Sequence, residues 1–260
     1  MAVSNKRILL TGAAGGIGSA FFRSASSAYF FRLADRQTET LTAASLQGHE
    51  IYPLDVSDLE ACQQACQGID TVIHLAANAS PDADFYGSLL QDNIQGSYNI
   101  FRAAKDQGCQ RVIFASSAQV FMGYPPDVQA HSHSPWRPAN MYGVSKCFGE
   151  AVAAYFAWTE GLSSIVLRIG AYDKAADPSN PIRRDPNTLN LSGYVSERDL
   201  NQLLRKAVDV EDVQFALIHG ISNNRFKRLD LTATQQILGY APQDDAFEIF
   251  HDDLTAWLQN

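Results

Sequence analysis

The sequence predicts an α/β fold in which a doubly wound parallel sheet carries helices on both faces. Short apolar runs that suit buried strands alternate with helical segments along the chain. The first of these runs leads into a glycine-rich turn that opens a helix. A length of 260 residues suits one large domain. We therefore expect a single domain of the Rossmann type over residues 1–260, in which segments near 171–195 and 220–260 contribute a small substrate-binding lobe.

The expected elements follow one another in alternation. Strands are expected near residues 6–11, 29–34, 49–53, 70–75, 110–115, 163–168 and 214–219. Helices are expected near residues 17–27, 58–66, 85–107, 141–160, 197–208, 230–237 and 246–258. Ligands of such folds bind beyond the carboxyl ends of the strands, so the functional residues are expected there.

The first strand and the first helix enclose a glycine-rich turn. Gly12 allows a tight turn, Gly15 lets a phosphate approach the backbone, and Gly18 lets the helix pack close to the sheet. Gly16 and Ile17 open the helix, where free N–H groups and the positive end of the helix dipole suit a pyrophosphate. The turn predicts a dinucleotide site.

The second strand ends at Asp35. An acid about 20 residues after such a turn typically bonds the ribose hydroxyls of adenosine, and it would repel the 2′-phosphate of NADP. Asp35 therefore favours NAD as the cofactor. Arg36 follows directly and keeps NADP open as an alternative, because an arginine at this place can accept a 2′-phosphate.

Tyr142 and Lys146 lie one turn apart on the helix expected near 141–160. A free phenol has a pKa near ~10, which is too high for a good base at neutral pH. A neighbouring ammonium can lower that pKa. The pair therefore predicts an acid/base centre that takes a proton from an alcohol or returns one to a carbonyl.

These motifs, in this order, resemble the extended branch of the short-chain dehydrogenase/reductase superfamily, the NAD-dependent epimerase/dehydratase family. The resemblance runs from about residue 6 to the C-terminus and includes the spacing Gly12-x-x-Gly15-x-x-Gly18. It implies a cofactor site to which further segments contribute Asp55, Val56, Leu75, Ala76, Ala77 and Asn93. The family also implies a homodimer or higher oligomer, in which the helices near 85–107 and 141–160 pair with their copies.

The resemblance also implies the catalytic roles. Ser117, at the end of the fifth strand, would hydrogen-bond the reacting oxygen, and Tyr142 would be the general acid/base. Lys146 would lower the pKa of Tyr142 and bond the nicotinamide ribose, and Asn93 would kink the central helix and support a water beside Lys146. Hydride passes between the substrate and the nicotinamide, so no metal is expected.

Within this family, the block from Arg137 to Glu150 resembles uronate dehydrogenases, as does Leu167-Arg168-Ile169-Gly170. Such enzymes oxidise the C1 hydroxyl of glucuronate or galacturonate to a lactone with NAD. The expected partner is therefore a small sugar or sugar acid. Ser80, just past the Ala76-Ala77 turn, is an expected substrate contact.

The chain departs from that group where substrate binds. Ala118 and Gln119 replace an Asn-His pair after the serine, and Ala171 replaces a serine. An arginine expected near Leu189 to clamp the carboxylate is missing, which matters because that bidentate fork recognises carboxylates. Arg184, or Arg183 beside it, is the candidate replacement, with a solvated loop charge as the alternative.

Two long segments interrupt the alternation, Ala118–Asn140 and Gly170–Gly193. Long connections without secondary structure are usually functional or disordered. Because both leave strand ends beside the expected nicotinamide pocket, we expect them to form substrate walls or lids, with plain solvent loops as the alternative. The first carries His131 and His133, for which the sequence suggests no role.

The composition narrows the functional class. A net charge of −8 argues against a nucleic-acid surface, and no apolar run approaches the ~20 residues that span a bilayer. The four cysteines, Cys62, Cys66, Cys109 and Cys147, lack metal-ligand spacing and suit reduced thiols in the cytoplasm.

Three functional hypotheses follow. The first is an NAD-dependent dehydrogenase of a sugar or uronate. The second is another enzyme of the extended branch, such as a nucleotide-sugar epimerase, a dehydratase or a carbonyl reductase. The third is a non-catalytic NAD-binding regulator, against which the complete set of Ser117, Tyr142 and Lys146 argues.

Overall fold

A seven-stranded parallel sheet forms the centre of the computed structural model, which describes residues 6–41, 48–172 and 181–259. Its strands are β1 (Arg7–Thr11), β2 (Phe30–Asp35), β3 (Glu50–Pro53), β4 (Thr71–His74), β5 (Arg111–Ser117), β6 (Ser163–Ile169) and β9 (Phe215–Gly220). They lie in the order β3-β2-β1-β4-β5-β6-β9, and every neighbouring pair is parallel. The predicted fold class and the predicted strands are confirmed.

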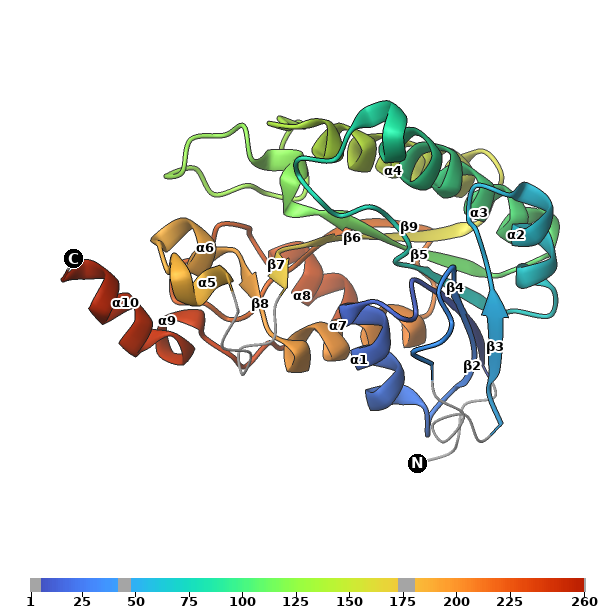
Figure 1. The fold of residues 1–260 in the computed structure, drawn as a ribbon, viewed down its shortest axis with the longest axis horizontal. Coiled ribbons are helices and arrows are strands. Elements are labelled where there is room, and N and C mark those ends of the chain that lie inside the picture. The colour runs from blue at the N-terminus through green and yellow to red at the C-terminus, as the bar shows by residue number, and fades with distance from the viewer. Residues whose placement is uncertain (1–5, 42–47, 173–180, 260) are drawn as a thin grey trace.

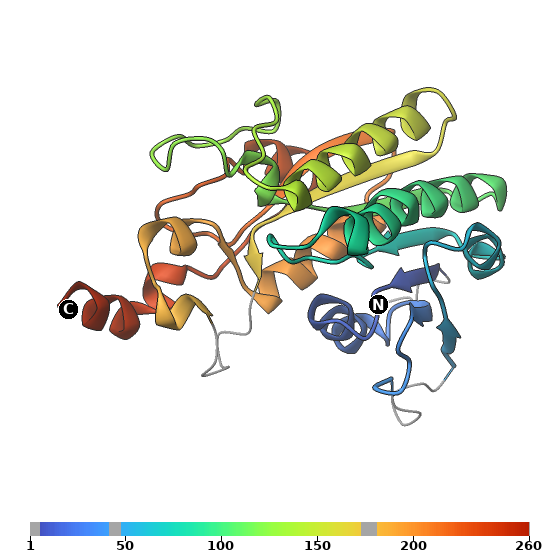
Figure 2. The ribbon, with the colours of Figure 1, turned by 45° about the horizontal axis from the view of Figure 1, so that its top comes forward.

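Helices cover both faces of this sheet (Figure 1). On one face lie α1 (Gly16–Ala25), α7 (Glu197–Asp209) and α8 (Thr232–Leu238). On the other lie α2 (Leu59–Cys66), α3 (Gly96–Asp106) and α4 (Met141–Trp158). Figure 2 shows α3 and α4 running side by side over the sheet. In the described part of the chain, no helix combines the length and the hydropathy that a membrane crossing requires.

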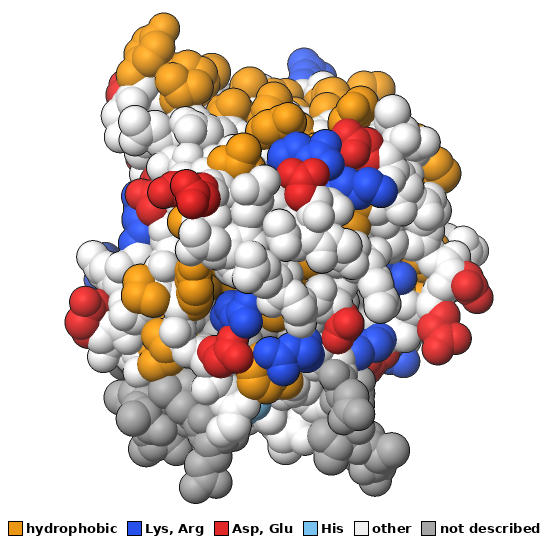
Figure 3. All heavy atoms as spheres, turned by 90° about the vertical axis from the view of Figure 1, so that its right-hand side faces the viewer, with side chains coloured by type: hydrophobic (Ala, Val, Ile, Leu, Met, Phe, Trp, Pro, Cys, Tyr) orange, Lys and Arg blue, Asp and Glu red, His pale blue; other side chains and the backbone are white. Residues whose placement is uncertain are grey.

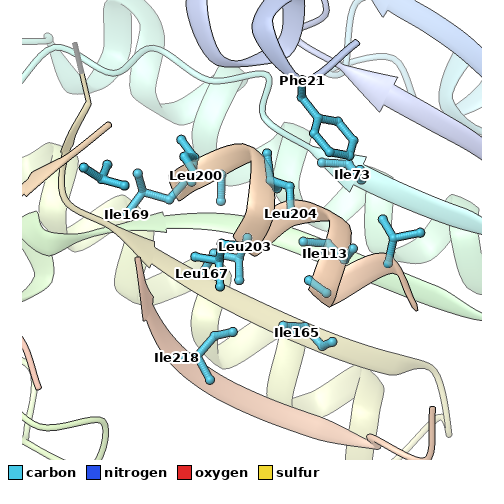
Figure 4. Packing of buried hydrophobic residues seen from close by; sticks show 14 of the residues in the cluster. Phe21, Ile73, Ile113, Ile165, Leu167, Ile169, Leu200, Leu203, Leu204 and Ile218 are labelled. Carbon is cyan, nitrogen blue, oxygen red and sulfur yellow. The ribbon is translucent and has the colours of Figure 1, made fainter. Parts of the chain in front are cut away.

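Successive residues of each strand point to opposite faces, which explains why the strands are apolar throughout. Ile8 and Leu10 of β1 belong to the core under α1 and α7, whereas Leu9 between them packs under α2 and α3. Figure 4 shows the first core, where Leu200 and Leu203 of α7 lie against the side chains of β6. Burying each such side chain contributes roughly 1.5–3 kcal/mol to folding.

A third apolar cluster lies at the C-terminal end of the molecule. It joins α5 (Pro181–Arg184), α6 (Thr188–Ser192), α9 (Ala246–Ile249) and the strand β8 (Tyr194–Val195), which pairs with β7 (Ala171–Tyr172). The helix α10 (His251–Leu258) follows and leads to the C-terminus (Figure 1). The segments predicted to form a lobe thus contain a small core of their own. Their role in substrate binding stays a prediction.

The prediction of one uniform helix over residues 85–107 is wrong. Residues Phe85–Gln95 form a π-helical segment, η2, and the α-helix α3 begins at Gly96. The N–H of Gly96 bonds the carbonyl of Gln91, five residues back. A Cβ atom on Gly96 would lie 2.6 Å from the side chain of Val56, so close packing against the loop after β3 fixes the change of winding.

The predicted helix over 246–258 is interrupted between α9 and α10. Phe250 stands at the break with a φ of −106° and a ψ of 25°, and its ring is fully buried in the third cluster. Burial of this ring against Tyr194, at a centroid distance of 5.3 Å, explains the bend.

The segments predicted to lack secondary structure contain some. Ala118–Phe121 forms a 3-10 turn, η3, and Gly170–Gly193 includes β7, α5 and α6. Residues 173–180 of the second segment lie outside the described residues.

All four cysteines are buried free thiols. Burial raises the pKa of Cys62 and of Cys147 to about 12. Because the thiolate is the reactive form, these side chains serve as packing groups.

Candidate active site

The glycine-rich turn between β1 and α1 forms a tight cradle at the carboxyl edge of the sheet. Gly12 has a φ of 71°, a conformation that favours glycine. A Cβ atom on Gly18 would overlap the carbonyl oxygen of Gly12 and lie 2.8 Å from the Cα atom of Ala13. Gly15 caps α1 without a side-chain hydrogen bond. No capping side chain therefore occupies the first N–H groups of the helix, which suits the binding of an anion there.

A cavity of about 180 Å³ lies beside this turn. Asp35 lines it, and its carboxylate accepts a hydrogen bond from the backbone N–H of Ala14 at 3.0 Å. Arg36 lines the same cavity, and its two terminal nitrogens bond the carboxylate of Asp92 at 3.0 and 3.1 Å. This end of the site thus presents the carboxylates of Asp35 and Asp92, and Asp92 holds the guanidinium of Arg36.

A second cavity, of about 430 Å³, adjoins the first and shares Gly12, Gly15, Leu75 and Ala77 with it. Together they form one groove across the place where the strand order reverses, between β1 and β4. The groove has an acid at one end, a glycine cradle at its centre and titratable side chains at the other end. This arrangement fits a dinucleotide laid across the turn.

Ser117, Tyr142 and Lys146 meet at the lining of the second cavity. The Nζ atom of Lys146 lies 5.6 Å from the ring centroid of Tyr142, as their spacing on α4 predicts. The same Nζ atom donates a hydrogen bond to the carbonyl of Ala115 at 2.8 Å. The carboxyl end of β5 and the first turns of α4 thus bring together a hydroxyl, a phenol and an amine.

Asn140 fixes the start of α4. Its side-chain oxygen accepts a hydrogen bond from the N–H of Gly143 at 2.8 Å, and its amide nitrogen donates to the side chain of Gln119 at 2.9 Å. A Cβ atom on Gly143 would lie 2.6 Å from the carbonyl oxygen of Gln119. The first turn of α4 is therefore locked against η3, which places Gln119 beside Tyr142 in the lining.

Burial shifts both titratable groups. It lowers the pKa of Lys146 to about 8 and raises the pKa of the Tyr142 phenol, against which only the hydrogen bond with Ser117 acts. The predicted lowering of the Tyr142 pKa by Lys146 stays a prediction, because burial sets the direction of the phenol's shift in the protein alone. The positive charge of an oxidised nicotinamide beside the phenol would favour its phenolate form.

Asn93 lies next to the groove rather than in its lining. Its side-chain oxygen accepts from the N–H of Asn78 at 2.9 Å, and its amide nitrogen donates to the carbonyl of Asn78 at 3.0 Å and to the hydroxyl of Ser145 at 2.9 Å. These bonds join the segment after β4 to α4. The contacts of Asn93 are those of a positioning residue, and its predicted support of a water stays a prediction.

The structure brings most of the predicted site residues to the groove. Those in its lining are Gly12, Gly15, Gly16, Ile17, Gly18, Asp35, Arg36, Val56, Leu75, Ala76, Ala77, Ser117, Gln119, Tyr142 and Lys146. Of the predicted residues, all of which the structure describes, those outside both linings are Asp55, Ser80, Asn93, Ala118, Ala171 and Arg184.

Hydrogen bonding explains the place of Asp55, and exposure to solvent explains that of Arg184. Asp55 accepts hydrogen bonds from the N–H and the hydroxyl of Ser57, at 2.9 and 2.7 Å, and these bonds lower the pKa of its carboxyl. Arg184 is exposed on α5. Its neighbour Arg183 pairs with Asp253 of α10 at 2.6 Å. The structure thus gives neither arginine a place in the described lining of the second cavity.

Several lining residues were not predicted as site residues. They are Thr11, Ala34, Leu54, Asp92, Ala79, Pro81, Ala115, Ser116, Ile169, Gly170 and Tyr172. Most of these residues stand beside a predicted residue at a strand end. A prediction that extended each motif by one or two residues would have included them. Tyr172 is different: its ring would lie 3.6 Å from a Cβ atom on Gly16, a contact across the fold.

The segment Ala118–Asn140 packs on the chain after β9. Ala130 pairs with Leu229, and the guanidinium of Arg228 donates to the carbonyls of Tyr124 and Val128. His131 and His133 are exposed and lie outside both cavity linings. Of the described segment, Gln119 alone reaches the second cavity.

His74, at the end of β4, is fully buried, and its Nδ1 atom bonds the hydroxyl of Thr11 at 2.8 Å. Burial lowers its pKa to about 3, so it is a neutral core histidine. Over residues 6–41, 48–172 and 181–259, the structure shows no group of three acidic, histidine or cysteine side chains that could hold a metal ion.

Comparison with known proteins places the chain among nicotinamide enzymes. Residues 8–172 match the NAD-dependent epimerase/dehydratase family. An NAD-dependent glucose-6-phosphate dehydrogenase of Haloferax volcanii is 32% identical and covers 93% of this chain and 94% of its own length. A uronate dehydrogenase of Pseudomonas putida is also 32% identical, over 92% of this chain and 85% of its own.

Solved structures show the same similarity to uronate dehydrogenases. A point mutant of the uronate dehydrogenase from Agrobacterium tumefaciens, complexed with NAD, superposes with a TM-score of 0.83 at 31% identity. The match covers 97% of this chain and 90% of that one. The resemblance predicted from the sequence is therefore confirmed along nearly the whole chain.

Proposed function

The chain belongs to the NAD-dependent epimerase/dehydratase family, and from this premise we propose that it is an NAD-dependent dehydrogenase that oxidises the C1 hydroxyl of a sugar, with uronates as the first candidates. The observation that carries the proposal is the meeting of Ser117, Tyr142 and Lys146 at a cavity that adjoins the glycine cradle. The similarity to sugar dehydrogenases over more than nine-tenths of the chain supports it.

The residues of the groove would hold NAD in two parts. Asp35 suits the adenosine ribose because its carboxylate lines the first cavity and accepts hydrogen bonds. The amides of Gly16 and Ile17, at the start of α1, suit the pyrophosphate. Lys146 and Tyr142 line the second cavity, which suits the nicotinamide end. When bound, NAD supplies the acceptor for the substrate's hydride.

The protein's own part in the reaction is to orient and deprotonate the sugar hydroxyl. Ser117 would donate a hydrogen bond to the reacting oxygen. Tyr142 would accept the hydroxyl proton, acting as general base. Lys146 lies over the Tyr142 ring and would stabilise the phenolate while its pKa, near 8, keeps it mostly protonated at neutral pH.

The second cavity is lined by neutral groups apart from Lys146, the one cation among its described lining residues. The Nζ atom of Lys146 already bonds the carbonyl of Ala115. An arginine that would clamp a carboxylate is absent from that described lining. A substrate panel that includes uronates, sugar phosphates and neutral sugars therefore tests the specificity.

We expect NADH to form when the protein and NAD are mixed with a panel of uronates, glucose 6-phosphate and neutral aldoses. Absorbance at the NADH band is the measurement, and the lactone product is identified by mass spectrometry. Nucleotide sugars are included as the substrates of the alternative function within the same family, and Tyr142→Phe provides the background rate. Turnover of nucleotide sugars alone would contradict the proposed function.

We also propose that the protein is a homodimer through α3 and α4. Tyr98 of α3 and Val144, Phe148 and Trp158 of α4 expose 45%, 39%, 36% and 67% of their surface. Figure 3 shows hydrophobic side chains gathered along the top of the molecule, where α4 lies. An exposed apolar face of this kind suits a two-fold interface.

Phe148→Glu is expected to shift the molecular mass in solution from dimer to monomer, because it would place charges face to face in the apolar interface. Light scattering after size exclusion measures this. Phe226→Glu is the matched control, since Phe226 is 66% exposed on the C-terminal lobe. The proposed interface would be contradicted if the unmodified protein were monomeric, or if Phe226→Glu dissociated the dimer and Phe148→Glu did not. The cytoplasmic location stays a prediction.

A further inference from the structure

Arg36 and Asp92 form a paired fork at the adenosine end of the groove. Nη1 of Arg36 lies 3.0 Å from Oδ1 of Asp92, and Nη2 lies 3.1 Å from Oδ2. The two parallel bonds are the bidentate geometry in which arginine binds carboxylates best. The Asp92 side chain is 11% exposed, whereas that of Arg36 is 58% exposed. Asp92 is thus fixed in the wall, and it draws the guanidinium to itself.

The position of this pair bears on the choice of cofactor. Both residues line the first cavity together with Asp35. An arginine beside the end of the second strand is the group that can receive the 2′-phosphate of NADP. Here both of its terminal nitrogens are engaged, so a phosphate would have to displace Asp92 to be bound. A displaced carboxylate would remain buried without its partner, which is costly.

The net charge at the adenosine end of the groove also disfavours a 2′-phosphate. Asp35 and Asp92 contribute two negative charges to the cavity wall, and Arg36 contributes one positive charge. Asp55 lies near enough for the charge of Arg36 to act on it. A phosphate dianion would therefore approach a wall that is negative overall, and like charges brought together raise the free energy of binding.

We propose that Asp92 is a specificity-determining residue that sequesters Arg36 and so excludes the 2′-phosphate of NADP. Selectivity for NAD then depends on two carboxylates, Asp35 from the end of β2 and Asp92 from η2. This inference rests on the proposed function only in that the groove binds a nicotinamide dinucleotide. It requires no knowledge of the sugar substrate.

A purely structural role for the pair makes a different prediction. If the ion pair only held η2 against the end of β2, its loss would weaken the binding of both cofactors alike and lower the thermal midpoint. Sequestration instead predicts that the loss of Asp92 changes the ratio of the two affinities, because Arg36 is released for the phosphate. The ratio is therefore the quantity to measure.

The test is Asp92→Asn, with NADH and NADPH titrated separately against the whole protein by nicotinamide fluorescence. The dissociation constant of NADPH is expected to fall by roughly tenfold, the effect of removing one like charge and freeing one cation beside the phosphate. That of NADH is expected to change far less. Because the readout is binding, it holds even if no sugar in the panel is oxidised.

Two control variants complete the test. The double variant Arg36→Ala/Asp92→Asn should lose the gain for NADPH, since the released guanidinium is gone. Asp252→Asn, a loss of the same charge on the exposed surface of α10, should leave both affinities unchanged. If Asp92→Asn folds poorly, Asp92→Ser carries the same expectation. An unchanged NADPH affinity in the folded variant, or an equal gain in the double variant, would overturn the proposal.

Discussion

Replacing Tyr142 by phenylalanine is expected to lower kcat by roughly two to four orders of magnitude, the usual contribution of a positioned general base. The substitution removes one hydroxyl from a residue that lies in the lining of the second cavity, beside Ser117 and Lys146. The ring stays, so the packing of α4 is retained. The dissociation constant of NADH should change little, which separates a lost base from a lost fold.

Tyr52→Phe is the matched control for this variant. Tyr52 lies on β3, and its hydroxyl bonds the side chain of Gln64 at 3.3 Å, outside both cavity linings. Loss of this hydroxyl should leave kcat unchanged. A kcat for Tyr142→Phe close to that of the unmodified protein would show that Tyr142 is not the base.

The pH dependence of kcat/KM should report the same groups. Burial raises the pKa of Tyr142, so the rate of sugar oxidation should rise with pH as the phenolate becomes accessible. Burial lowers the pKa of Lys146 to about 8, so its ammonium, and the support it gives the phenolate, is lost as the pH rises through that value. In Tyr142→Phe the rising limb should disappear.

The second large effect is expected from Glu150→Gln, which should lower the free energy of unfolding by roughly 3–5 kcal/mol, the usual cost of breaking a buried ion pair. Glu150 of α4 and Arg168 of β6 are each 1% exposed, and two parallel bonds of 2.7 and 2.6 Å join them. Removing the carboxylate charge leaves the guanidinium buried without its counter-ion.

The same carboxylate fixes two further groups, which adds to the expected loss. The hydroxyl of Ser116 and the indole N–H of Trp136 each donate to Glu150 at 2.6 Å. Arg168 in turn donates to the carbonyl of Ser132 at 2.8 Å. Glu150 thus joins α4, the end of β5 and the segment Ala118–Asn140 around one buried charge.

Urea unfolding of Glu150→Gln and of Glu160→Gln measures this effect against a matched control. Glu160 pairs with Arg102 at 2.9 Å, but both side chains are partly exposed. A surface pair of this kind contributes about 1 kcal/mol or less. Equal losses in the two variants would contradict the assignment of Glu150–Arg168 as a stabilising buried pair.

Most of the fold could be predicted from the sequence, because strand hydrophobicity, turn glycines and helix spacing are each set by residues close together in the chain. The strands are apolar on both faces, and the glycines at 12 and 18 stand where backbone atoms leave no room for a side chain. The pairing of Tyr142 with Lys146 follows from helix geometry alone. Where prediction failed, distant contacts decided the structure: Val56 against Gly96, and Phe250 in the third cluster.

The sequence by itself determined the class of cofactor site, the alternation of strands and helices along the chain, and the grouping of a serine, a tyrosine and a lysine. Only the tertiary structure decided that Arg36 is bound by Asp92, that Asn93 joins Asn78 to Ser145, and that burial raises the pKa of Tyr142. The physical reason is the same in each case. Ion pairing and desolvation depend on which groups meet across the fold, and residues far apart in the chain meet only when the parallel sheet brings their strand ends together.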